Sequence, residues 1–111
     1  MRAFRLDVNR NLVEISCNDI TRQDWAIENR RVAIDRVGPL EVSTVFLVIE
    51  HTGAKAGSMV FETMVFVRED NVQSPWEDWQ DRYSSWDDAL EGHNAVVNAL
   101  HGGLDPKDLL H

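Results

Sequence analysis

The sequence has few of the residues and patterns that mark several common protein classes. It contains a single cysteine, Cys17, among 111 residues, so no internal disulfide can form and disulfide-rich scaffolds are excluded. Its longest apolar run covers residues 45–49, whereas a membrane-spanning helix needs about 20 apolar residues in a row. Basic residues number 11 against 19 acidic ones, and a general nucleic-acid binder needs a basic surface for phosphate contacts. We therefore expect no membrane span and no direct binding of nucleic acid.

The chain length predicts one domain over residues 1–111, with a core large enough to fold without disulfides. Residues 1–20 are weakly patterned, and residues 104–111 are expected to fray. The N-terminus carries Arg2 and Arg5 but lacks the apolar run of about 7–15 residues that a secretory signal contains. These features predict a cytoplasmic protein.

Three segments in the centre of the chain have the composition of strands. Residues 31–37 alternate between apolar and polar, and residues 41–51 and 59–67 are rich in β-branched and aromatic side chains. A Gly-Pro pair after the first segment favours a tight turn, and the glycine-bearing residues 52–58 favour a loop. We predict an antiparallel meander of these three strands within a sheet of three to five strands.

Two further patterns predict helices. Thr21 and Asp24 form a capping-box signature at the start of a short helix over about 21–29. A stronger pattern predicts a C-terminal helix over about 86–101, which begins after an N-cap at Ser85. Its expected buried stripe consists of Trp86, Ala89, Leu90, His93, Val97 and Leu100. The predicted fold is α+β, with this helix packed on one face of the antiparallel sheet.

Between the predicted sheet and helix, residues 70–85 have the composition of a polar connector. Residues 69–91 hold eight acidic side chains and one arginine, and large aromatic residues are interleaved with them. One interpretation is a solvated acidic connector whose aromatic rings pack onto the core. The other is an interaction surface, because aromatic residues are favoured at interfaces and negative potential attracts basic partners. The predicted partner-binding residues are Trp76, Glu77, Asp78, Trp79 and Asp81.

Metal-binding and catalytic motifs are absent from the sequence. It has no CxxC or HExxH motif and no nucleophile elbow, so no catalytic residue and no cofactor is predicted. His51, Glu62 and His93 are weak candidates for a two-histidine, one-carboxylate metal site. Alternatively, His51 caps a strand end and His93 bonds to a backbone carbonyl or a sheet carboxylate. Glu62 would then pair with Arg82, Tyr83 or His93.

Five short strings of residues carry a resemblance to a protein family. They are Arg30-Arg31-Val32-Ala33, Val42-Ser43-Thr44-Val45-Phe46-Leu47 leading to His51, Phe61-Glu62-Thr63-Met64-Val65-Phe66, Arg82-Tyr83-Ser84-Ser85-Trp86 and Ala89-Leu90-Glu91-Gly92-His93. In this order the chain resembles a family of small uncharacterised bacteriophage and prophage proteins over about residues 21–101. It departs from the family pattern at residues 49–51, in the loop 52–58 and in a longer Trp-rich insert around 72–80. The resemblance implies a phage origin and a location in the host cytoplasm, and it implies no mechanism.

These observations leave three functions open. The first is a small phage-encoded interaction protein whose acidic segment binds a host protein with a basic surface, for example as an inhibitor of a host nuclease or defence complex. The second is a structural or assembly accessory that self-associates through a sheet edge, for example as a homodimer. The third is a small metal-dependent enzyme that uses His51, Glu62 and His93. We favour the first, in which the protein acts by binding and not by catalysis.

Overall fold

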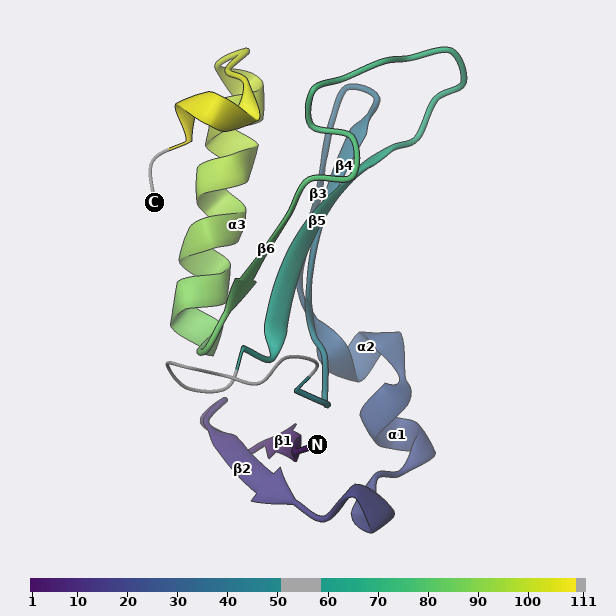
Figure 1. Ribbon diagram of the computed structural model, residues 1–111, viewed down its shortest axis with the longest axis vertical. Coiled ribbons are helices and arrows are strands. Elements are labelled where there is room, and N and C mark those ends of the chain that lie inside the picture. Colours follow the sequence, from purple (N-terminus) through teal and green to yellow (C-terminus); the bar gives the residue numbers. More distant parts are fainter. Residues whose placement is uncertain (51–58, 110–111) are drawn as a thin grey trace.

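The computed structural model describes residues 1–50 and 59–109 and has the α+β fold expected from the sequence (Figure 1). Its elements in chain order are β1 (Ala3–Leu6), β2 (Leu12–Ile15), η1 (Cys17–Asp19), α1 (Arg22–Trp25), α2 (Ile27–Arg30), β3 (Arg31–Val37), β4 (Leu40–Phe46), β5 (Phe61–Val67), β6 (Gln80–Tyr83), α3 (Trp86–His101) and η2 (Pro106–Asp108). The strands β1 and β2 form an antiparallel hairpin. The main sheet is antiparallel with the order β3-β4-β5-β6, and α3 lies along one of its faces (Figure 1).

The predicted central meander is present as β3, β4 and β5. Gly38 takes a φ of +58° in the turn between β3 and β4, a conformation that glycine adopts without strain. β4 ends at Phe46, earlier than predicted, and the chain takes a positive φ of 71° at Val48. There the Val48 carbonyl accepts a backbone hydrogen bond from the Phe4 N–H at 2.8 Å. This contact ties the N-terminal hairpin to the main sheet, while the predicted loop 52–58 lies outside the described residues.

A fourth strand, β6, lies within the segment that the sequence predicted to be a polar connector. Its four residues pair with the first half of β5, and Tyr83 lies opposite Phe61. Four residues form too short an alternation to identify a strand from sequence alone. The strand conformation follows from pairing, because the edge of β5 presents backbone N–H and C=O groups that need partners.

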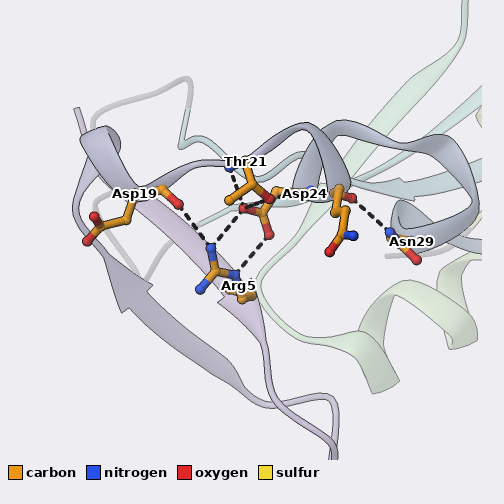
Figure 2. A network of polar contacts seen from close by, with 6 residues as sticks. Arg5, Asp19, Thr21, Asp24 and Asn29 are labelled. Atoms are coloured by element: carbon orange, nitrogen blue, oxygen red, sulfur yellow. Dashed lines mark hydrogen bonds and ion pairs between the residues drawn. The ribbon is translucent and has the colours of Figure 1, made fainter.

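The helix predicted over 21–29 is divided into two single turns. α1 and α2 meet at Ala26, whose ψ of 130° is extended and interrupts the helix. The predicted capping box is confirmed, since the Asp24 N–H bonds to Thr21 Oγ1 and the Asp24 carboxylate accepts from the Thr21 N–H. Arg5 of β1 donates to both oxygens of the same carboxylate, each at 2.9 Å (Figure 2). This ion pair holds the N-terminal hairpin against α1.

The C-terminal helix α3 has the predicted bounds and the predicted cap. Ser85 Oγ accepts a hydrogen bond from the Asp88 N–H at 3.1 Å. The buried face differs from the predicted stripe, because it consists of Ala89, His93, Val96 and Ala99. Leu90, which the stripe included, is 36% exposed. Within the described part of the chain, no helix is long and apolar enough to cross a membrane.

The interface between α3 and the main sheet contains two apolar clusters separated by a polar layer. The first cluster contains Phe4, Phe46, Val48, Val60, Phe61 and Ala89. The second contains Leu40, Val42, Val65, Trp76, Val96 and Ala99. The polar layer consists of Thr44, Thr63 and His93, none of which has exposed surface. Because these three side chains are removed from solvent, they need hydrogen-bond partners within the protein.

The segment after α3, for which the sequence predicted fraying, packs on the second cluster. Trp76 Nε1 donates a hydrogen bond to the Leu104 carbonyl at 2.8 Å. The helical turn η2 follows, and Leu109 packs against the same cluster. Residues 110 and 111 lie outside the described residues.

Candidate functional site

His93 lies at the centre of α3 and has no exposed surface. Its Nε2 atom lies 2.7 Å from Asp35 Oδ2 on β3, and its Nδ1 atom lies 2.7 Å from Thr44 Oγ1 on β4. A carboxylate accepts hydrogen bonds and does not donate them, so Nε2 carries a proton and donates it to Asp35. The interpretation that His93 bonds to a sheet carboxylate is therefore confirmed.

The hydrogen bonds continue from Thr44 across the main sheet. Thr44 Oγ1 lies 2.5 Å from Oγ1 of Thr63, its cross-strand neighbour on β5. Asp35, His93, Thr44 and Thr63 thus form one hydrogen-bond chain, which runs from β3 through α3 to β4 and β5. Its first end reaches the surface at Asp35, whose side chain is 53% exposed.

A cleft lies between β6 and α3, and we call it the acidic cleft. It has a volume of about 240 Å³ and is lined by Asp81, Tyr83, Asp88, Glu91, Gly92, Ala95 and Leu109. A second cleft of about 490 Å³ adjoins it along α3 and is lined by Asp87, Leu90, Glu91, Asn94, Ala95 and Asn98. No lysine, arginine or histidine of residues 1–50 and 59–109 lines either cleft. Both therefore present negative charge to solvent.

Tyr83 packs directly against α3 at Gly92, where the helix has no side chain to keep the ring away. A β-carbon at Gly92 would lie 2.3 Å from the Tyr83 hydroxyl oxygen, which is far inside van der Waals contact. Burial raises the pKa of the Tyr83 phenol, and the nearby Asp81 carboxylate adds to the rise, although the hydrogen bond from Thr63 opposes it. Tyr83 consequently keeps its proton at neutral pH and can act as a hydrogen-bond donor or acceptor at the cleft.

The predicted partner-binding residues occupy different environments. Trp76 is 2% exposed and belongs to the second apolar cluster, so its ring is unavailable to a partner in this conformation. Trp79 is half-buried and contacts Trp76 edge to face, with ring centroids 5.4 Å apart. Glu77 and Asp78 are exposed, and Asp81 lines the acidic cleft. The aromatic residues of this segment thus pack onto the core, while its carboxylates remain at the surface.

The predicted metal site is not assembled from Glu62 and His93. Glu62 ion-pairs with Arg82, with Nε and Oε2 2.9 Å apart, as the alternative interpretation proposed. Side chains alternate along β5, and Thr63 faces α3, so Glu62 points to the opposite face of the sheet from His93. His51 lies outside the described residues. In the part of the chain that the structure describes, no group of three or more His, Cys, Asp or Glu side chains is placed to hold a metal ion.

Sequence reasoning identified His93 and an unspecified sheet carboxylate, but it did not identify Asp35, Thr44 or Thr63 as the residues that join it. A signal was present, because Thr44 and Thr63 are polar residues on the inward faces of strands whose other inward residues are apolar. Their pairing with His93 depends on the strand register and on how α3 crosses the sheet. Comparisons with protein-family models, with curated proteins and with solved structures found no match to this chain.

Proposed function

We propose that the protein acts by binding a partner protein with a basic surface at the acidic cleft. The observation that carries this proposal is the set of carboxylates around the two adjoining clefts, contributed by Asp81, Asp87, Asp88 and Glu91. No cationic side chain among the described residues lines these walls. A surface of one charge sign attracts oppositely charged groups and accelerates their association.

The resemblance to small bacteriophage proteins extends this proposal to the nature of the partner. In the host cytoplasm, a nuclease or a DNA-binding defence complex presents a basic surface to the phosphates of its substrate. An acidic protein that occupies such a surface excludes the nucleic acid and so inhibits the enzyme. The net charge of −8 supports a basic protein as the partner, because it repels nucleic acid itself.

Charge reversal at Glu91 tests the proposal, because this exposed residue lines both clefts. Glu91→Lys places one cation at the wall that both clefts share, and Glu69→Lys is a matched control at an exposed position outside them. Tagged wild-type protein and both variants are incubated with bacterial lysate, and the captured proteins are identified by mass spectrometry. We expect wild type and Glu69→Lys to capture one near-stoichiometric protein that Glu91→Lys loses. Equal capture by all three, or none by wild type, contradicts the proposal.

Self-association through β3 is a second candidate function. β3 forms one edge of the main sheet, no described strand pairs with its outer side, and Ile34 on it is 41% exposed. A register shift near Arg31 and the exposed Arg36 disfavour pairing between edges. Sedimentation equilibrium separates the two functions, since a stable dimer that Ile34→Lys dissociates supports assembly, whereas a monomer excludes it.

A further inference from the structure

We propose that a cavity between the N-terminal hairpin and the two short helices, which we call the hairpin cavity, binds an uncharged purine nucleoside through its base. Its lining includes Arg5, Leu6, Gln23, Asp24, Asn29 and Phe46, which belong to β1, α1, α2 and the end of β4. Its volume of about 480 Å³ lies within the range of about 300–1,000 Å³ that is typical of small-molecule sites. No described residue lines both this cavity and either acidic wall of α3, so the proposal is independent of the function proposed above.

The charged side chains of the hairpin cavity are paired with each other, which disfavours a charged ligand. Arg5 donates to both carboxylate oxygens of Asp24, and its Nη2 atom also donates to the Asp19 carbonyl at 3.1 Å (Figure 2). The Asp24 carboxylate accepts two further hydrogen bonds, from the Thr21 N–H at 2.8 Å and from the Thr21 hydroxyl at 3.1 Å. A cation would have to compete with Arg5 for Asp24, and an anion with Asp24 for Arg5. The cavity therefore favours a neutral ligand.

Two uncharged amide groups supply the hydrogen-bonding capacity that the ion pair lacks. Asn29 Nδ2 donates to the Gln23 backbone carbonyl at 2.8 Å, which fixes the Asn29 amide and leaves its Oδ1 atom as an acceptor (Figure 2). No residue in the described part of the chain hydrogen-bonds to the side-chain amide of Gln23, which is exposed and lines the cavity. This amide offers an acceptor and a donor side by side in one plane.

The donor and the acceptor of the Gln23 amide match one edge of adenine. A glutamine amide forms two hydrogen bonds with adenine, one with the N6 amino group and one with the N7 atom. Leu6 and Phe46 supply the apolar part of the lining, against which a flat base can pack. The Asn29 Oδ1 acceptor can then take a hydrogen bond from a sugar hydroxyl. An adenine nucleoside combines this base edge, an apolar ring face and the absence of charge, which are the three properties that the cavity favours.

NMR titration of isotope-labelled protein with adenosine tests the proposal. We expect saturable shifts of the backbone amide signals of Leu6, Gln23 and Asn29, which line the cavity. Inosine has an oxygen in place of the N6 amino group, so it presents two acceptors on this edge and should bind about tenfold more weakly. Adenosine 5′-monophosphate should also bind more weakly than adenosine, because Arg5 is already paired and the protein has a net charge of −8. This last comparison distinguishes a free nucleoside from a nucleotide or a nucleic-acid strand as the source of the base.

Substitution of Gln23 separates recognition of the base edge from unspecific packing of a ring in the cavity. Gln23→Ala removes the amide from an exposed position, so the fold should be retained while the affinity for adenosine falls about tenfold. Gln73→Ala, at an exposed position outside the cavity, is the matched control and should bind adenosine as wild type does. The proposal is overturned by a lack of saturable adenosine binding, by equal affinity for adenosine and inosine or the monophosphate, or by full affinity in Gln23→Ala.

Discussion

Thr44 places a hydroxyl in the middle of an apolar strand face, and its replacement by valine tests what the polar layer contributes to stability. Thr44→Val keeps the shape but leaves His93 Nδ1 and the Thr63 hydroxyl without their shared partner. We expect the free energy of unfolding, measured by urea denaturation, to fall by about 1–3 kcal/mol. Ser43→Ala, on the opposite face of the same strand, is the control and should change it by less than about 0.5 kcal/mol. A Thr44→Val protein as stable as wild type would contradict a structural role for the layer.

At Gly92, α3 packs so closely against Tyr83 of β6 that one added carbon atom would not fit between them. Alanine ordinarily stabilises a helix relative to glycine by about 1 kcal/mol. Here its β-carbon would overlap the Tyr83 hydroxyl, and we expect Gly92→Ala to lower the free energy of unfolding by about 1–3 kcal/mol. Thermal and urea denaturation measure the change. In a Tyr83→Ala background the overlap is gone, so the same substitution should become stabilising, and a loss in both backgrounds would refute the packing argument.

At the scale of elements, the contact between β1 and α1 depends on the charge of Asp24. Hydrogen bonds from Arg5 hold the pKa of this carboxyl well below its usual range, with a further contribution from Thr21. A carboxyl with a lowered pKa in the folded state stabilises the fold above its unfolded pKa of about 3.9, and this stability is lost as the pH falls below that value. We expect wild type to lose more stability than Asp24→Asn when urea denaturation at pH 7 is compared with that at pH 3. Equal losses would show that the ion pair contributes nothing.

The helices differ in how far their local sequence determines where they begin and end. α3 begins after Ser85 as predicted, because an N-cap and helical periodicity are local properties of the sequence. The helix predicted over 21–29 is interrupted at Ala26, although its capping box is present. We attribute the interruption to tertiary contacts, since Arg5 anchors α1 to the hairpin while α2 leads directly into β3. Single turns of this kind are too short to be stable helices without such contacts.

At the scale of the whole molecule, the polar layer and the acidic cleft arise from one packing arrangement. α3 packs along one face of the main sheet (Figure 1). This packing places His93 against Thr44 and Asp35 of the sheet and Gly92 against Tyr83. The same packing places the carboxylates of the first half of α3 beside those of β6. The packing of α3 on the sheet therefore creates the buried polar layer and the charged surface together.

The amino-acid sequence by itself determined the α+β class, the central meander and the bounds of α3, because these depend on local periodicity and on local turn and capping residues. Tertiary structure decided the existence of β6 and, with it, the choice of Arg82 among the three partners that the sequence left open for Glu62. It also decided the buried position of Trp76 and the faces on which Glu62 and His93 lie. The physical reason is register: a shift of one residue moves a strand's side chains to the other face, and register is set by contacts between distant segments. The partners of His93 are contributed by three strands distant from it along the chain, so only the folded molecule brings them together.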